Sequence, residues 1–212
     1  MAELEKYLMG LDAGNTVIKT VLFDLKGNQV AISALDGSSR SPAPGHVERD
    51  LNELWTNAQS AIRDCITKAG IAPDQIIGLG CAGHRNGLYL LDTAGEPLLG
   101  IQSLDTRAAG LAAELAERNR DALHGICLQK PWPLQTPTLL VWVKRNRPET
   151  YAKAATAFLR KDFITYRLTG ELVSDLSDMS GCGFTRMPDC LYDAELLGLY
   201  RLFDAADILP KL

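Results

Sequence analysis

Residues suited to phosphate and metal chemistry stand close together near the start of the chain. Asp12, Gly14, Asn15 and Thr16 lie between two apolar runs, and Lys19 follows within the second run. A carboxylate holds Mg²⁺ directly or through water, and a glycine lets backbone N–H groups approach a phosphate. A hydroxyl and a lysine add a hydrogen bond and a positive charge. The set predicts a site for a metal-bound phosphate, with an ordinary hairpin turn as the alternative.

Two strands are expected to position this set. Residues 8–11 and 17–23 are rich in Leu, Val, Ile and Phe, which favour strands, and Gly14 with Asn15 favours a turn between them. A third antiparallel strand is expected over residues 29–35. The phosphate-binding side chains would therefore stand at the tip of a β-hairpin.

One helix is predicted clearly. Residues 51–69 place their apolar side chains on one helical face, Asp50 and Glu53 have the spacing of a capping box, and Gly70 ends the helix. A buried strand follows over residues 75–81. Three strands, a helix and another strand predict an α/β domain with a mixed sheet and helices on its faces.

A second group of polar residues follows two apolar runs further along the chain. Arg85 offers fixed donors, Asn86 offers a donor and an acceptor, and Asp105 accepts hydrogen bonds. Groups of this kind, placed where strands end, suit a ligand with several hydroxyl groups. The alternatives are a solvated surface turn for Arg85 and Asn86, and a helix cap for Asp105.

Several other kinds of site are excluded by their sequence context. Gly78, Gly80 and Gly83 form a G-x-G-x-x-G pattern, but a turn and another strand follow Gly83, whereas a dinucleotide site needs a helix there. The chain contains no P-loop motif and no G-x-S-x-G motif. Its three histidines show no spacing typical of metal ligands.

The amino-acid composition limits the expected binding partners and the expected cellular compartment. The 212 residues suit one domain, or one and a fragment, and the net charge is −4 with no basic run interleaved with aromatics, so no nucleic-acid partner is expected. Five scattered cysteines without a C-x-x-C pair indicate a reducing compartment. No signal-peptide pattern and no apolar stretch of about 20 residues is present, so we expect a cytoplasmic protein with no membrane partner.

Taken in order, these motifs resemble the N-terminal domain of the FGGY carbohydrate kinases. The resemblance covers essentially the whole chain and is strongest toward the pentulose kinases, the group of L-xylulose kinase and xylulokinase. It rests on the segments GLDAGNTVIKTVLFD, PGHVERD, GLGCAGHRNGLYLLD, LDTR, TPTLLVWVKRNRPE, DFITYRLTGE and ILPKL. At Arg85 and Asn86 the sequence departs from the Met-His pair of many xylulokinases.

The resemblance implies both a fold and an activity. The fold would be an actin-like (ribonuclease H-like) domain of the ATPase superfamily, with a mixed sheet of five-stranded type and helices on both faces. Residues 1–212 would form the sugar-binding domain, and the protein's own C-terminal domain, absent from this chain, would bind ATP. The activity would be ATP- and Mg²⁺-dependent phosphorylation of a small sugar, such as the pentulose xylulose, at a primary hydroxyl.

The resemblance also implies a role for each candidate residue. Asp12 would bind the metal ion. The phosphates would be bound by Gly14, Asn15, Thr16 and Lys19. The sugar would be bound by Arg85, Asn86 and Asp105. No catalytic residue is expected within the chain, because the family's general base lies beyond the position of Leu212. The chain by itself is therefore expected to be inactive.

Two alternatives remain open from the sequence. The chain would instead be a truncated, non-catalytic module of the same fold that binds sugar or contributes an interface. It would otherwise be another actin-fold phosphotransferase, such as a relative of glucokinase or acetate kinase, although the Arg85-Asn86 and L-D-T-R pairing argues against this. The sequence also leaves the oligomeric state open, and a homodimer is one possibility. The sequence that follows Leu212 in the intact gene would discriminate between the first alternative and a kinase.

Overall fold

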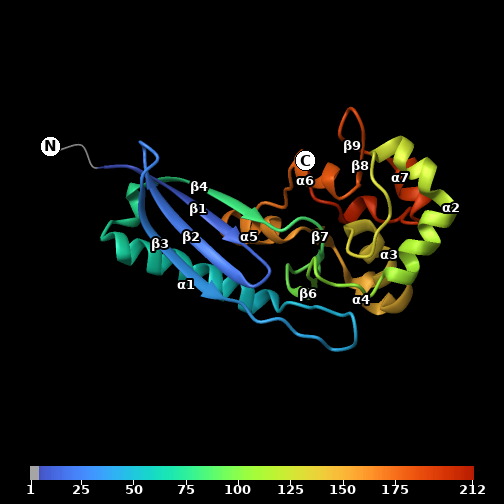
Figure 1. Ribbon diagram of the computed structural model, residues 1–212, viewed down its shortest axis with the longest axis horizontal. Helices are drawn as coiled ribbons and strands as arrows, with labels where there is room; N and C mark the ends of the chain where they lie inside the picture. The colour runs from blue at the N-terminus through green and yellow to red at the C-terminus, as the bar shows by residue number, and fades with distance from the viewer. Residues whose placement is uncertain (1–4) are drawn as a thin grey trace.

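The computed structural model describes residues 5–212, which form an elongated molecule. A four-stranded sheet and a long helix form the end near the N-terminus, and most other helices gather at the opposite end (Figure 1). Among residues 5–212 no helix is both long enough and apolar enough to cross a membrane.

The first sheet carries the predicted phosphate-binding turn. Its strands are β1 (Tyr7–Ala13), β2 (Val17–Asp24), β3 (Gln29–Asp36) and β4 (Ile76–Gly83). Their order is β3-β2-β1-β4, with β4 parallel to β1 and the other pairs antiparallel. The predicted meander of three strands and the mixed sheet are confirmed. Within the described residues this sheet has four strands, where five were predicted.

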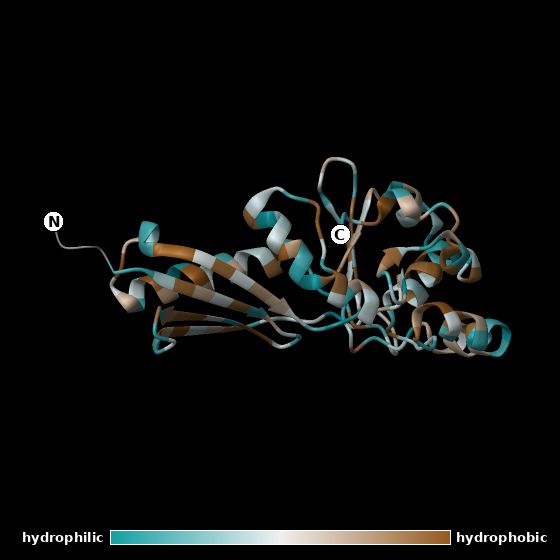
Figure 2. Ribbon diagram, turned by 90° about the horizontal axis from the view of Figure 1, so that it is seen from above, coloured by the Kyte–Doolittle hydropathy of each residue, from teal (hydrophilic) through white to brown (hydrophobic). Residues whose placement is uncertain are grey.

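Within residues 5–212, helices pack against one face of the sheet. Alternate residues of β1 are buried, and they share an apolar cluster with α1 (Leu51–Ala69) and α5 (Arg160–Thr169). Both helices therefore cover the same face, whereas helices on both faces were predicted. Apolar residues remain accessible on the other face, where Leu8 is 46% exposed and Val30 and Ile32 are each 41% exposed. Figure 2 shows the resulting alternation of polar and apolar residues along the strands.

Helix α1 begins and ends at the predicted residues. The Asp50 carboxylate accepts hydrogen bonds from the backbone N–H groups of Asn52 and Glu53, which satisfies two free donors of the first turn. Gly70 closes the helix in the left-handed conformation, with φ of 65°. The buried side chains of α1 lie against the sheet and stabilise the packing by burying apolar surface.

Most of the remaining elements form the second half of the molecule, and one 3₁₀ turn precedes β4 in the first half. A small antiparallel sheet has the order β6-β5-β7, and a two-stranded hairpin lies nearby. The strands are β5 (Leu88–Leu91), β6 (Pro97–Ile101), β7 (Thr156–Phe158), β8 (Thr185–Arg186) and β9 (Leu191–Tyr192). The α-helices are α2 (Ala109–Cys127), α3 (Thr136–Asn146), α4 (Pro148–Lys153), α6 (Leu176–Gly181) and α7 (Ala194–Leu199), and two 3₁₀ turns are η1 (Pro73–Gln75) and η2 (Ala206–Ile208).

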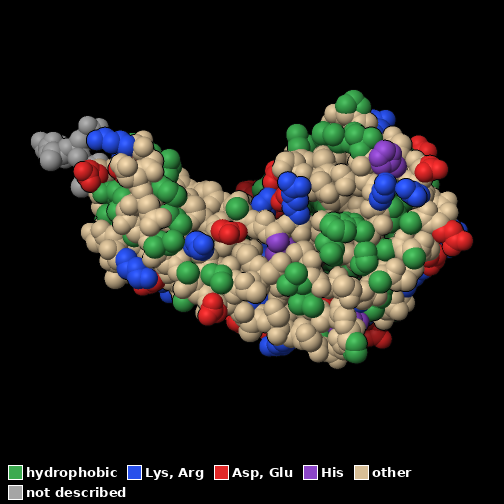
Figure 3. Space-filling view, in the orientation of Figure 1, with side chains coloured by type: hydrophobic (Ala, Val, Ile, Leu, Met, Phe, Trp, Pro, Cys, Tyr) green, Lys and Arg blue, Asp and Glu red, His purple; other side chains and the backbone are tan. Residues whose placement is uncertain are grey.

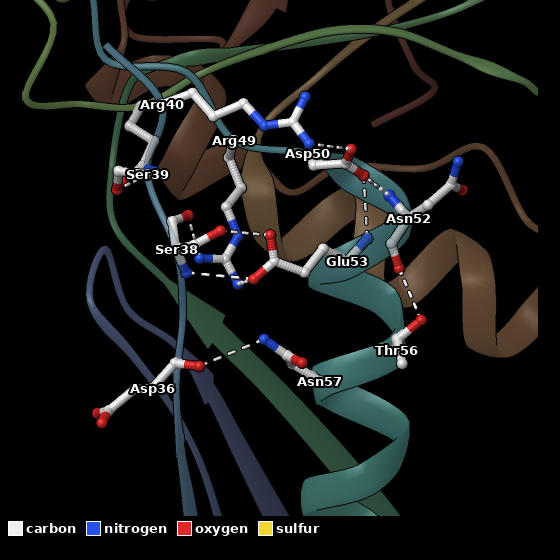
Figure 4. Close-up of polar contacts among 11 residues, drawn as sticks. Asp36, Ser38, Ser39, Arg40, Arg49, Asp50, Asn52, Glu53, Thr56 and Asn57 are labelled. Atoms are coloured by element: carbon white, nitrogen blue, oxygen red, sulfur yellow. Dashed lines mark hydrogen bonds and ion pairs between the residues drawn. The ribbon is translucent and has the colours of Figure 1, made fainter.

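The loop between β3 and α1 joins the two halves. Residues 40 and 48 form an antiparallel bridge, and the backbone N–H of Arg49 donates to the carbonyl of Gly100 in β6 at 2.9 Å. Figure 4 shows further polar contacts, in which Ser38 bonds to Glu53 of α1 and Arg40 pairs with Asp50. The loop is therefore tied both to the first sheet's helix and to the second sheet.

Candidate functional site

The first bend between β1 and β2 is a tight turn that requires glycine. The backbone N–H of Gly14 donates to the carbonyl of Val17 at 3.0 Å, which closes the turn. A Cβ atom at Gly14 would lie 2.9 Å from the same carbonyl oxygen, too close for any other residue without a backbone shift. The carbonyl of Thr16 accepts from the N–H of Gly37 at 2.7 Å, which anchors the bend to the loop after β3.

Asp12 and Lys19 stand beside each other on the open face of the sheet. They are opposite partners in the antiparallel pairing of β1 and β2, and both side chains are exposed. Among residues 5–212 neither forms an ion pair, so the carboxylate of Asp12 is free to bind a ligand. A shallow groove of about 270 Å³ adjoins them, with Gly10, Val21 and Gly80 among its lining residues.

The turn after β4 lies at the same end of the sheet as the first bend. The parallel register places Ala13 opposite Gly83, so the residues that follow each strand leave the sheet side by side. Arg85 is exposed, whereas Asn86 is 5% exposed and has φ of 60°. The Oδ1 atom of Asn86 is buried and has no hydrogen-bond partner within the described part of the chain.

A hydrogen bond connects the first bend to a third segment. The Nδ2 group of Asn15 donates to Oγ of Ser103 at 3.1 Å. Ser103 also borders the turn after β4, because a Cβ atom at Gly87 would lie 3.4 Å from its backbone nitrogen. The structure therefore brings together residues 12–19, the turn 84–87 and Ser103. Figure 3 shows that the molecular surface is hollowed between the end carrying the first sheet and the opposite end.

Asp105 is fully buried in an ion-pair network. Its carboxylate accepts from the backbone N–H of Val47 at 2.6 Å and from Nε of Arg107 at 2.9 Å. Arg107 also pairs with Glu48, and its guanidinium lies 5.0 Å from the ring centre of Trp142. With both oxygens engaged, Asp105 has no free side for the sugar hydroxyls predicted for it. It orders the segment that carries Ser103, and it does not cap α2, which begins at Ala109.

Hydrogen bonds link the half-buried His84, in the turn after β4, to Tyr89 of β5. Nδ1 of His84 is 3.2 Å from the carbonyl oxygen of Arg85, and Nε2 is 3.1 Å from the hydroxyl oxygen of Tyr89. Burial and the nearby positive charge of Arg160 lower the pKa of His84 to about 4. Burial raises the pKa of Tyr89 to about 12.

Comparison with known proteins identifies the family of the chain. The family model for the N-terminal domain of the FGGY family of carbohydrate kinases matches residues 7–212. The chain belongs to the FGGY family of carbohydrate kinases.

Other FGGY kinases are similar along almost the whole chain. An L-xylulose/3-keto-L-gulonate kinase of Escherichia coli strain K12 is 32% identical over 209 residues, covering 98% of this chain and 42% of the relative. An autoinducer-2 kinase of the same strain is 31% identical over 214 residues, covering 99% and 40%. The crystal structure of a xylulose kinase from Rhodospirillum rubrum is 27% identical with a TM-score of 0.88, covering 98% and 43%. The chain thus spans about two-fifths of the length of these FGGY kinases.

The residues of this FGGY domain fit a magnesium–phosphate group. Mg²⁺ usually keeps several waters and binds through one or two carboxylates together with substrate phosphates. The described residues contain no group of three or more His, Cys, Asp or Glu placed to enclose a metal, but Asp12 offers one exposed, unpaired carboxylate. Gly14 brings backbone close to the same point, and Lys19 adds a positive charge.

Two residues at this site were missed from the sequence. Ser103 is a single serine in an ordinary loop sequence, and only its contact with Asn15 reveals its place. Arg160 is fully buried and has no ion-pair partner among the residues that the structure describes, whereas arginine is usually exposed or paired. Neither residue carries a local pattern, because both acquire their position through segments far away in the sequence.

Proposed function

We propose that the intact protein transfers the γ-phosphoryl group of ATP to a primary hydroxyl of a small sugar, a pentulose such as xylulose. This chain would form the sugar-binding half. A C-terminal domain beyond Leu212 would bind ATP and contribute the general base. The observation that carries the proposal is the free carboxylate of Asp12, which lies on the open face at the sheet end where the turn 84–87 also begins.

The proposed sugar site is the turn after β4. The guanidinium of Arg85 is exposed and donates to hydroxyl oxygens, while the unpartnered Oδ1 of Asn86 accepts a hydrogen bond from a hydroxyl group. A buried acceptor without a donor is costly, so a ligand that donates to Asn86 gains affinity. Asp105 contributes indirectly, because it holds the backbone of Val47 and the neighbouring Arg107 beside Ser103.

The proposed phosphate path, the place where the phosphates of ATP would lie, is the bend between β1 and β2, residues 12–19. Asp12 would hold Mg²⁺, which neutralises phosphate charge and orients the transferred group when it is bound. Thr16 and Lys19 are exposed and offer a hydroxyl and a positive charge. Gly14 offers close backbone approach, and Asn15 contributes through its backbone because its Nδ2 group is engaged by Ser103. These residues position the phosphate rather than exchange protons with it.

Substrate class follows from chemistry and from the relatives. Arg85 and Asn86 match a compound with several adjacent hydroxyl groups, and related proteins are named as kinases of xylulose, L-xylulose and autoinducer-2. A ketopentose fits both observations.

Two measurements test the proposed function. The intact protein should convert ATP and D- or L-xylulose to ADP and the sugar phosphate, and the chain ending at Leu212 should bind the same sugar in calorimetry without turning it over. The variant Asn86→Leu tests the site itself: it removes the hydrogen-bonding amide and should weaken sugar binding by tenfold or more, about 1.4 kcal/mol. Sugar-dependent turnover by the chain ending at Leu212, or no turnover by the intact protein with any ketopentose, polyol or sugar acid, would contradict the proposal.

A further inference from the structure

Lys161 joins three aspartates at the start of α5. Its Nζ atom pairs with Asp162 beside it, with Asp175 at 2.7 Å and with Asp178 at 3.2 Å. An ammonium group has three N–H donors, so three carboxylates engage all of them and none is left for a ligand. The side chains of Lys161 and Asp162 are only 15% and 2% exposed, so salt screens these ion pairs little. Lys161 therefore links the first turn of α5 to the N-terminal end of α6.

Asp162 fastens a further segment at the same point. Its Oδ2 atom accepts from the backbone N–H of Leu159 at 3.1 Å and from Oγ of Ser174 at 2.8 Å. The backbone N–H of Ser174 in turn donates to the carbonyl of Lys211 at 2.8 Å. The start of α5 and residues 174–178 thus form one connected block.

The first turn of α5 also packs against the end of β4. A Cβ atom at Gly83 would lie 3.3 Å from the backbone nitrogen of Lys161 and 3.5 Å from the carbonyl oxygen of Ala13. Gly83 is therefore held between the end of β1 and the start of α5, with little free space on either side. The turn 84–87 begins at the next residue. The position of α5 thus determines where this turn leaves the sheet.

We propose that Lys161 is a positioning residue, whose ion pairs to the α6 end hold the first turn of α5 against Gly83 and thereby fix the turn 84–87. The turn depends on such support, because Asn86 and Gly87 are two successive residues in the left-handed region, with φ of 60° and 79°. The consequence for sugar binding rests on the proposed function, whereas the consequence for the backbone of the turn does not.

Amide hydrogen exchange in the intact protein measures the effect on the turn without using the kinase reaction. The N–H of Gly87 donates to the carbonyl of Leu134 at 3.1 Å, and this bond slows exchange only while the turn keeps its shape. Loss of the ion pairs to α6 should speed exchange over residues 84–88 at least tenfold. Exchange in β3, at the opposite edge of the sheet from β4, should stay within a factor of two and serves as the internal reference.

The double variant Asp175→Asn/Asp178→Asn is the sharpest test, because it removes both ion pairs to α6 and keeps Lys161 paired with Asp162. No buried charge loses its last partner, and asparagine caps a helix as well as aspartate does, so the fold should survive. Lys161→Arg keeps the charge and should exchange within a factor of two of the wild type. Lys144→Met is the matched control, since it removes a lysine ion pair at α3.

The outcomes separate the inference from the proposed function. Unchanged exchange over residues 84–88 in the double variant would overturn the inference, and so would an equal rise in Lys161→Arg, in Lys144→Met or throughout β3. In steady-state assays of the intact protein, the double variant should raise the KM for xylulose at least threefold and leave kcat and the KM for ATP within a factor of two. A wild type that turns over no sugar would instead refute the proposed function, and hydrogen exchange would still decide the role of Lys161.

Discussion

Asn15 and Ser103 are joined by a 3.1 Å hydrogen bond across 88 residues of sequence. The bond connects the bend that carries Asp12 to the segment that follows β6, and this segment borders the turn 84–87. The proposed phosphate path and the proposed sugar site are thus adjacent, and Ser103 contacts both.

Asp105 should be a major determinant of stability rather than of sugar recognition. Its fully buried carboxylate is bonded to Val47 and Arg107, so Asp105→Asn removes one of the two carboxylates that pair with the buried Arg107, the other being Glu48. We expect a loss of about 3–5 kcal/mol in the free energy of unfolding, measured by urea denaturation. The exposed Asp121→Asn serves as control and should change stability by less than about 0.5 kcal/mol. Equal stability of the two variants would contradict this role.

Gly87 should tolerate no side chain. It has φ of 79°, and a Cβ atom there would lie 2.6 Å from the carbonyl oxygen of Ile101. Gly87→Ala should therefore destabilise the fold by about 1–3 kcal/mol and displace the turn that carries Arg85. Gly10→Ala is the matched control, because a Cβ atom at Gly10 would meet nothing within 4 Å on the open face. Thermal unfolding of both variants checks the prediction, and a larger effect at Gly10 would be inconsistent with it.

Local sequence patterns predicted much of this fold. They failed where contacts between residues far apart in the sequence determine the packing or the role of a residue. The hairpin around Gly14 and the helix Leu51–Ala69 follow from turn chemistry and apolar spacing, which act between neighbouring residues. The role of Asp105 depends on Val47, 58 residues away, and no local pattern encodes that contact. The same holds for the single packed face of the sheet, since the pattern of a strand does not say which helices will cover it.

Acid should destabilise the protein through His84. Its pKa is about 4 in the folded chain and about 6.5 when unfolded, so the unfolded chain binds more protons between these values. The free energy of unfolding should therefore fall as pH is lowered from 7 to 4, by roughly 2–3 kcal/mol from this residue. The measurement compares urea denaturation of the wild type and His84→Gln, which removes the titrating group. Parallel pH profiles for the two proteins would contradict the assignment.

The open face of the sheet should bind hydrophobic probes. Leu8, Val30 and Ile32 are each more than two-fifths exposed there, and a contiguous apolar surface of this kind is uncommon on a soluble monomer. Ile32→Lys should reduce the fluorescence of a bound naphthalene sulfonate dye by about half, with little change in stability. Leu25→Lys removes an isolated exposed leucine at the β2–β3 turn and should leave the signal unchanged. Equal effects of the two variants would show that the dye binds elsewhere.

The most direct test concerns Asp12, the carboxylate that the proposal assigns to the magnesium–phosphate group. In the intact protein, Asp12→Asn should lower kcat at least a hundredfold, about 2.7 kcal/mol, and weaken Mg²⁺–ATP binding, while calorimetry should find sugar affinity within a factor of two of the wild type. Asp36→Asn, on the exposed end of β3, is the control and should retain full activity. An Asp12→Asn protein with unchanged kcat, or one that loses sugar affinity and keeps Mg²⁺–ATP binding, would contradict the account.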